Sequence, residues 1–312
     1  MLLIKKDILM VILTVVSTKG GTGKTTLTAA LAAVLADMGF RVLMVDTDTQ
    51  ASLSKYYPLH RRAPNGTVEL LLGKNDEASI RSTISNTVYP NLDIVLSNNI
   101  RDDVQSKVYD RPDRAFLLRN KLIHPYISEN YDAVLIDTKG AVGVIQDAAC
   151  FAANMLISPI MPETLSAREF ISGTQEALER LAHGAAMNLP VPPLRALIYG
   201  KDRTKDARMI TESIRAYFNS GLDGKKQLLS LEIPHAKAYK EAATLRIPVH
   251  CHEHTHAGKS DSARQLMIAL VQELFPKIKE ERIVCHTFGE HLENLLLEEG
   301  VGQPEIVREV QS

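Results

Sequence analysis

The chain has 312 residues, of which 45% are hydrophobic and 23% are charged. These proportions are typical of a globular protein with a sizeable core, and they exclude a disordered, collagen-like or coiled-coil chain. The three cysteines are odd in number and far apart, which argues against a secreted disulfide framework and favours a reducing compartment. The formal net charge of −1 gives by itself no indication of a nucleic-acid partner.

Short apolar runs alternate with helical patterns along the chain. The first run is nine residues long, about half the ~20 that span a bilayer, so we expect a buried strand there. Strands are predicted at Ile8–Val16, Arg41–Val45, Leu92–Leu96, Ala133–Ile136, Met155–Ser158, Leu194–Tyr199 and Leu228–Ile233. Helices are predicted at 27–38, Thr67–Leu72, Arg114–Ile127, Ile145–Ala153, Leu165–His183, Asp206–Asn219 and Ser260–Phe275. This alternation predicts one α/β domain over residues 1–279, with a mainly parallel sheet and helices on both faces, and a mostly helical tail over 280–312.

A glycine-rich loop follows the first predicted strand and precedes the first predicted helix. It has the sequence KGGTGKTT over residues 19–26. In such a loop, backbone N–H groups converge on a phosphate at a helix N-terminus, where the helix dipole also favours negative charge. Lys24 is expected to reach the β- and γ-phosphates, Thr25 to bind Mg²⁺ and Thr26 to contact the α-phosphate. The nucleotide-binding residues predicted here are Lys19, Gly20, Gly21, Thr22, Gly23, Lys24, Thr25 and Thr26.

The loop departs from the usual P-loop pattern, because Thr18 stands at the position of its first glycine and Lys19 adds a second lysine. In this it resembles the deviant Walker A motif of the ParA/MinD ATPases, most of all the ParA partition proteins of plasmids and integrative conjugative elements. The resemblance covers about residues 10–275 and implies the three-layer P-loop NTPase fold. It also implies an ATP-dependent sandwich dimer in which Lys19 reaches the partner's nucleotide, so that Lys19 and Lys24 act in catalysis.

Two acidic segments are expected to complete the site. The sequence DTDTQ over residues 46–50 resembles the family's second motif, with threonine in place of proline at position 49. Asp137 ends an apolar run and resembles the Walker B aspartate. By this resemblance Asp48 positions or activates the attacking water, and Thr25, Asp46 and Asp137 hold Mg²⁺ directly or through water.

Lys139 follows the third aspartate, where the family commonly has a small residue or proline. It places an unusual charge near the γ-phosphate, so the resemblance indicates nucleotide binding more firmly than it indicates a hydrolysis rate. Two later segments, 199–204 and 233–242, also resemble the family. By that resemblance Arg203 and Pro234 border the nucleotide base.

The net charge conceals two oppositely charged parts of the chain. Residues 280–312 hold eight glutamates and two arginines, a charge of −6, so the remaining residues carry +5. Residues 199–246 hold ten bases and six acids, a charge of +4. From charge alone a solvated helix face is the favoured explanation of such a cluster, but the resemblance favours nonspecific contact with DNA phosphates. The DNA-binding residues predicted are Lys237 and Lys240, followed by Arg208 and Arg215. We expect the acidic tail to shield this basic segment.

A histidine-rich run, His250–His256, contains Cys251 and is rich in metal-ligating residue types. Alternating histidines could bind Zn²⁺, but the sequence shows no second cluster to close the site, so a solvated loop is favoured. Cys150 lies in an alanine-rich helix and is expected to be buried as packing.

The sequence therefore predicts a ParA-type Mg-ATPase that forms an ATP-dependent homodimer, binds DNA nonspecifically and maintains a DNA element. The resemblance implies a ParB-like partner that stimulates slow hydrolysis, in the cytoplasm on the nucleoid, and no membrane partner. A MinD-like positioning ATPase would need a basic amphipathic C-terminal helix, but this end of the chain is acidic. An iron–sulfur carrier would need a CxxC pair, which the sequence lacks. A slow nucleotide-bound scaffold for secretion or conjugation remains an alternative because of Lys139.

Overall fold

The computed structural model describes residues 10–17, 19–98, 102–140, 143–163, 191–220, 225–256 and 260–278. It also describes Gly258, Cys285 and positions 173, 176, 177, 179–182 and 184. The predicted helix over 165–183 and the predicted tail over 280–312 therefore lie largely outside the described residues. Among the described helices, none is long and apolar enough to cross a membrane.

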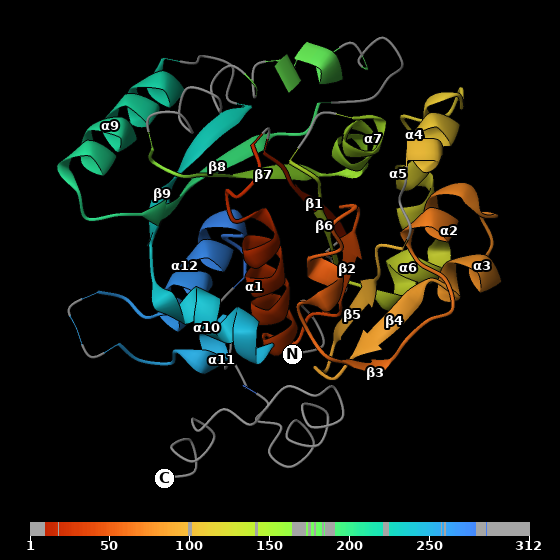
Figure 1. Cartoon of the computed structure of the whole chain (residues 1–312), viewed down its shortest axis with the longest axis horizontal. Helices are drawn as coiled ribbons and strands as arrows, with labels where there is room; N and C mark the ends of the chain where they lie inside the picture. The colour runs from red at the N-terminus through yellow and green to blue at the C-terminus, as the bar shows by residue number, and fades with distance from the viewer. Residues whose placement is uncertain are drawn as a thin grey trace.

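The described strands form one nine-stranded sheet in the order β3-β4-β5-β2-β6-β1-β7-β8-β9 (Figure 1). All neighbouring pairs from β5 to β9 are parallel, whereas β4 is antiparallel to both β3 and β5. The strands are β1 Val11–Val15, β2 Val42–Asp46, β3 Leu59–Arg61, β4 Ile84–Thr87, β5 Leu92–Val95, β6 Ala133–Asp137, β7 Met155–Ile160, β8 Leu194–Lys201 and β9 Lys226–Pro234. The mainly parallel sheet predicted from the sequence is confirmed.

Helices cover both faces of the sheet. Consecutive side chains of a strand point to opposite faces, and in β2 Met44 belongs to one apolar core while Leu43 and Val45 belong to another. Figure 1 shows α1, α10, α11 and α12 together on one side of the sheet. The helices are α1 Lys24–Asp37, α2 Thr67–Leu72, α3 Glu77–Arg81, α4 Asp102–Tyr109, α5 Leu117–Leu122, α6 Pro125–Asn130, α7 Val144–Ala152, α9 Lys205–Asn219, α10 Lys237–Leu245, α11 Val249–His252 and α12 Ala263–Leu274, with the short 3₁₀ turn η1 Leu53–Lys55.

The single helix predicted over Arg114–Ile127 is wrong, because the chain forms α5 and α6 there. Pro125 has no N–H to continue the first helix and stands at the first position of the second. His124 lies between the two helices and is the N-cap of α6. Its Nδ1 accepts a hydrogen bond of 3.2 Å from the Tyr126 N–H. The break therefore lies at His124-Pro125.

The helix α1 is buried along nearly its whole length, which makes it the central element on its side of the sheet. Eleven of its fourteen residues are buried, most of them alanine and leucine. Small side chains let the helix approach β2, β6 and β1 closely, and α12 packs on its outer side. Because α1 begins directly at the glycine-rich loop, this packing fixes the position of that loop.

We predict that Thr67→Val destabilises the protein by about 1–3 kcal/mol, measured by urea unfolding. The buried Thr67 hydroxyl donates to the Asp46 carbonyl at 2.7 Å, and it joins the start of α2 to the end of β2. Valine would leave that buried carbonyl without this donor. The matched control Thr244→Val, on an exposed face of α10, should change the free energy of unfolding by less than about 0.5 kcal/mol. Equal effects of the two substitutions would contradict the prediction.

Candidate nucleotide-binding site

The glycine-rich loop connects the carboxyl end of β1 to the first residue of α1. Gly21 and Gly23 have φ angles of 78° and 86°, in the left-handed region that favours glycine. Gly23 is constrained a second time, because a Cβ atom there would overlap the ring of Tyr199, with Cδ1 at 2.8 Å. The loop thus turns tightly enough to present its backbone N–H groups at the start of the helix.

Lys24 lies at the base of this loop and is only 7% exposed. Its Nζ donates to the Lys19 carbonyl at 3.2 Å. Burial lowers the pKa of Lys24, while the carboxylates of Asp137 and Asp48 act in the opposite direction. A partly desolvated ammonium of this kind gains strongly from an anionic ligand.

Asp137 ends β6 and stands in register with Val15 of β1 and Asp46 of β2. Its Oδ2 accepts a hydrogen bond of 2.6 Å from the Thr25 hydroxyl, and burial raises its pKa to about 7. The second oxygen, Oδ1, is buried and has no hydrogen-bond partner within the described part of the chain. A hydroxyl beside an unsatisfied carboxylate oxygen is a suitable ligand pair for a hard divalent cation such as Mg²⁺.

Asp46 is also buried, but its carboxylate is already engaged. It accepts hydrogen bonds from the Ser54 N–H at 2.8 Å, the Ser54 hydroxyl at 2.7 Å and the Asp48 N–H at 3.0 Å. These bonds hold the loop that carries Asp48. The resemblance implies that Asp46 holds Mg²⁺ directly or through water. Its oxygens already accept these three hydrogen bonds, whereas Oδ1 of Asp137 accepts none among the described residues, so Asp137 is the better placed of the two carboxylates.

An open cleft of about 690 Å³ lies over the loop. Asp48 lines it, as predicted, and so does Lys139. The loop after β6 lies directly against the glycine-rich loop, since a Cβ on Gly140 would be 2.9 Å from the Gly20 Cα. The lining residues are Gly20, Gly21, Gly23, Lys24, Thr25, Thr26, Asp48, Gln50, Ser52, Tyr56, Lys139 and Gly140. Gln50 ends the DTDTQ segment that resembles the family's second motif. No motif marks Ser52 or Tyr56, and the only signal of these two residues in the sequence is that they follow Asp48 closely.

The structure places Arg203 and Pro234 in a second cleft of about 500 Å³, which Lys237 also lines. Neither residue lines the cleft over the glycine-rich loop. Tyr199 lies between the two clefts. Its ring contacts Gly23, which lines the first cleft, and packs edge-on against Tyr239, which lines the second, with the ring centroids 6.0 Å apart. The position of Arg203 and Pro234 beside the nucleotide base thus stays a prediction. It requires that a nucleotide bound at the glycine-rich loop extend past Tyr199 into the second cleft.

The four basic residues predicted to contact DNA do not form one patch. Lys237 and Lys240 are exposed near the start of α10, whereas Arg208 is exposed on α9. These helices cover opposite faces of the sheet, since α10 packs in the core of α1 and α9 packs in a separate core with β8. Arg215 forms an ion pair with Glu232, which leaves its guanidinium less available for a phosphate.

The histidines of the run His250–His256 have different surroundings in the structure. His250 is buried in α11, whereas His252, His254 and His256 contact Glu241, Arg264 and Glu253 respectively. Cys150 is buried and free, as expected. The sequence argues against a disulfide framework, yet this structure joins Cys251 to Cys285 in a disulfide, because the fold brings together two cysteines that are 34 residues apart.

Known proteins share this fold and sequence pattern. A family model described as an AAA domain matches residues 10–183. The cell division protein PomZ of Myxococcus xanthus is 34% identical over 47% of this chain and 45% of that protein. The chromosome-partitioning ATPase Soj of Treponema pallidum is 27% identical over 78% of this chain and 90% of its own length.

The chain spans about half the length of several of the curated relatives it matches, PomZ among them. Among solved structures, a McdA–ATP complex from Cyanothece superposes with a TM-score of 0.65 at 17% identity, covering 95% of this chain and 98% of that one. At this identity the superposition shows a shared fold. Because the family model matches more than half of the chain, including the glycine-rich loop, and partition ATPases are among its relatives, the protein belongs to the ParA/MinD family of P-loop ATPases.

Proposed function

We propose that this protein is a ParA-type ATPase that binds and hydrolyses Mg-ATP and maintains a DNA element. The observation that carries the proposal is the cleft over the loop, where Lys24, Thr25 and Asp48 face the same space beside the buried Asp137. Several relatives are partition proteins, among them Soj and the ParA protein of Caulobacter vibrioides. These names support a partition function for this chain.

The geometry of the cleft supports a separate role in phosphoryl transfer for each of its charged and hydroxyl side chains. Thr25 and Asp137 would hold Mg²⁺, which neutralises charge on the phosphates when it is bound. Lys24, buried at the loop, would contact the β- and γ-phosphates. Asp48, held by the bonds that Asp46 makes, would position the attacking water, and Lys19 would reach the nucleotide of a second copy.

The proposed cycle uses ATP to hold two copies together and DNA as a surface for the dimer. Lys237 and Lys240 are exposed within one turn of α10 and are the best-placed phosphate contacts. A ParB-like protein would stimulate release by accelerating hydrolysis. A slow-turnover scaffold is the second candidate, favoured by Lys139 in the lining of the cleft.

We predict that the two lysines of the loop can be separated by substitution. Lys24→Ala should weaken ATP binding about 10- to 100-fold in a calorimetric titration, because a hydrogen bond to a charged group contributes about 1.5–3 kcal/mol. Lys19→Ala should retain ATP binding but lose the ATP-dependent dimer in analytical ultracentrifugation. Normal ATP binding by Lys24→Ala would refute the assignment of the cleft, and a full dimer with Lys19→Ala would refute the sandwich.

We predict that the apparent affinity for Mg²⁺ falls as the pH drops from 8 to 6. Burial raises the pKa of Asp137 to about 7, so protons compete with the cation for its carboxylate below that pH. The measurement is a Mg²⁺ titration of ADP binding at each pH. Asp137→Asn should bind Mg²⁺ weakly and show only the pH dependence of the nucleotide itself. An identical pH profile for both proteins would contradict the role of Asp137.

We predict that DNA stimulates ATP turnover and that DNA binding weakens steeply with salt. Each lysine that contacts a phosphate should contribute about 0.9 to the slope of log affinity against log salt, so Lys237→Ala and Lys240→Ala should each lower that slope by about 1. Lys74→Ala, an exposed lysine after α2, is the matched control and should leave it unchanged. Stimulation by anionic lipid instead of DNA would favour the positioning ATPase, and no turnover with either would favour the scaffold.

A further inference from the structure

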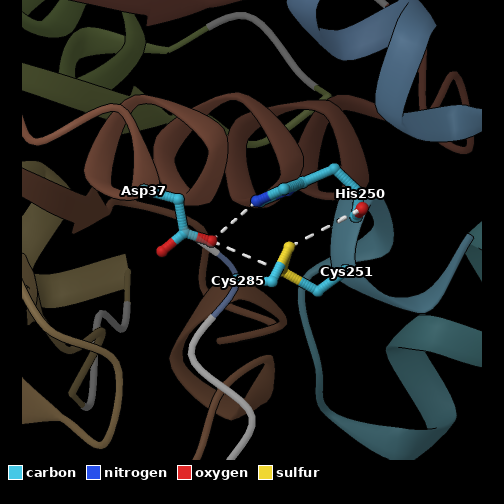
Figure 2. Close-up of side chains that lie close together, drawn as sticks. All are labelled: Asp37, His250, Cys251 and Cys285. Atoms are coloured by element: carbon cyan, nitrogen blue, oxygen red, sulfur yellow. Dashed lines mark hydrogen bonds and ion pairs between the residues drawn. A yellow bond between two sulfur atoms is a disulfide. The ribbon is translucent and has the colours of Figure 1, made fainter. Parts of the chain in front are cut away.

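Four metal-ligating side chains meet at the end of α1 that is farthest from the nucleotide cleft (Figure 2). Asp37 is the last residue of α1, His250 and Cys251 lie in α11, and Cys285 follows α12. One ligand atom from each of the four lies within 4.8 Å of the other three. Three separate segments of the chain therefore converge on one point.

The carboxylate of Asp37 is the centre of this cluster. Its Oδ2 lies 2.7 Å from the His250 Nε2 and 3.4 Å from the Cys251 Sγ. The His250 side chain is fully buried and that of Asp37 is 7% exposed. The His250 Nδ1 is buried with no hydrogen-bond partner among the described residues. Polar groups in such a position are costly unless they are paired or bind an ion.

The two cysteines supply the remaining ligands when they are thiols. The structure joins them in a disulfide, with Cα atoms 5.6 Å apart. Disulfides are rare where cellular reductants keep thiols reduced, and the third cysteine, Cys150, is a free thiol. In the reduced chain, Cys251 and Cys285 would present two sulfur atoms beside an imidazole and a carboxylate.

Two sulfurs, one imidazole and one carboxylate form a donor set that suits zinc. Zinc bonds of about 2.0–2.3 Å place the atoms of a tetrahedral site about 3.3–3.8 Å apart, which is within the span of this cluster. The sulfurs need to separate from bonding distance, and the Asp37 Oδ2 and His250 Nε2 atoms need to separate from their hydrogen-bond distance of 2.7 Å. The Asp37 Oδ2 and Cys251 Sγ atoms, 3.4 Å apart, already lie close to the required spacing. Four protein ligands fill all positions of the tetrahedron, so the site would be closed, as structural zinc sites are.

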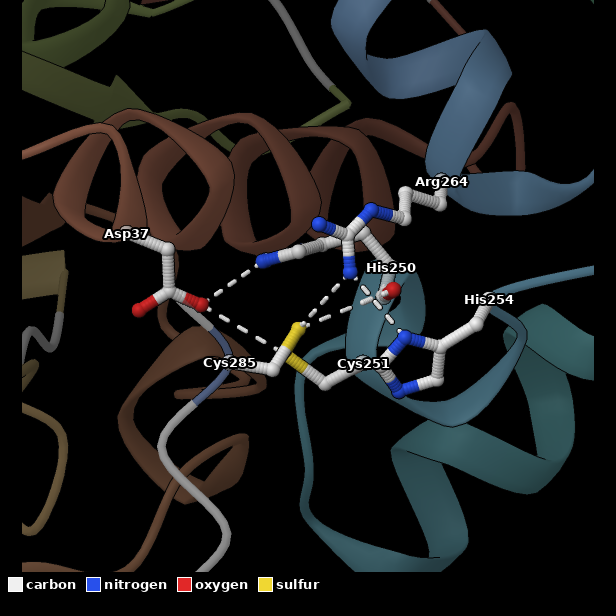
Figure 3. Close-up of a disulfide and its surroundings, with 6 residues drawn as sticks. All are labelled: Asp37, His250, Cys251, His254, Arg264 and Cys285. Carbon is white, nitrogen blue, oxygen red and sulfur yellow. Dashed lines mark hydrogen bonds and ion pairs between the residues drawn. A yellow bond between two sulfur atoms is a disulfide. The ribbon is translucent and has the colours of Figure 1, made fainter. Parts of the chain in front are cut away.

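A neighbouring cation favours the thiolate form (Figure 3). The Nη1 atom of Arg264 lies 3.6 Å from the Cys285 Sγ and 3.0 Å from the His254 Nδ1. A guanidinium beside a thiol stabilises the thiolate, which is the form that binds metal. With Arg264, the charges of two thiolates and one carboxylate would balance those of a divalent ion.

We propose that the reduced protein binds one zinc ion through Asp37, His250, Cys251 and Cys285. The ion would join the end of α1 to α11 and to the chain after α12, and so would act as a structural cross-link. His252, His254 and His256 take no part, because their rings contact other side chains. This site is separate from the nucleotide cleft, and the proposal does not depend on the proposed ATPase function.

The test uses the full chain without an affinity tag or nucleotide, reduced with a phosphine, and titrated with Zn²⁺ against a chromophoric chelator. We expect one zinc ion per chain. Cys251→Ser and Cys285→Ser should each weaken zinc binding by about 100-fold or more, because loss of a ligand exceeds the 10- to 100-fold effect of outer contacts. Co²⁺ in place of zinc should show thiolate-to-metal charge transfer and the absorption of a tetrahedral ion. Cys150→Ser and His252→Ala are the matched controls and should change neither result.

Asp37→Asn keeps the shape of the side chain and guards against loss of fold. It should bind zinc about 10-fold more weakly and alter the Co²⁺ spectrum while retaining the circular dichroism of the parent protein. Two outcomes would overturn the proposal. One is a reduced chain with three free thiols that binds no zinc, which would leave a disulfide as the only function of the pair. The other is zinc binding that survives Cys285→Ser but is lost when His252, His254 and His256 are replaced together.

Discussion

The hydrogen bond between Thr25 and Asp137 joins the start of α1 to the end of β6, and the geometry of the nucleotide cleft depends on it. Parallel strands place their carboxyl ends at one edge of the sheet, and the register of β1, β2 and β6 aligns Val15, Asp46 and Asp137 there. The loop after β1 can therefore meet the side chains that follow β2 and β6. A shift of one residue in the pairing of β6 with β1 would turn Asp137 away from Thr25.

This arrangement buries two ionisable side chains, Lys24 and Asp137, at a cost in free energy that a bound ligand can offset. Burial raises the pKa of Asp137 and lowers that of Lys24, so it disfavours the charged form of both side chains. A cation beside Asp137 and a phosphate beside Lys24 would each restore the charged form. Burial raises the pKa of Asp46 as well, but its carboxylate accepts three hydrogen bonds that act in the opposite direction. Neighbouring aspartates on the same sheet edge therefore differ in how much a bound cation would compensate for their burial.

Local patterns in the sequence predict the parts of the fold that local physics determines. The long apolar strands and the glycine-rich loop were found because burial on both faces and a left-handed turn leave clear signals, as at Gly23. The short strands β3 and β4, the last two at one end of the sheet, carry polar residues, so no apolar run in the sequence marks them. The Arg215–Glu232 ion pair and the meeting of Cys251 with Cys285 depend on tertiary contacts between distant segments, and no spacing in the sequence encodes them.

The helix α1 runs from the nucleotide cleft at Lys24 to the cluster of metal-ligating side chains at Asp37, and its composition limits how one site can affect the other. Its fourteen residues extend about 20 Å from Lys24 to Asp37, and the middle of the helix is packed on all sides by apolar residues. A close-packed alanine-rich helix has no room to bend locally, so a ligand at one end affects the other only by moving or holding the whole element. An ion at Asp37 would therefore act on the glycine-rich loop through the stability of α1 in its place on the sheet, and not through a change in the geometry of the loop itself.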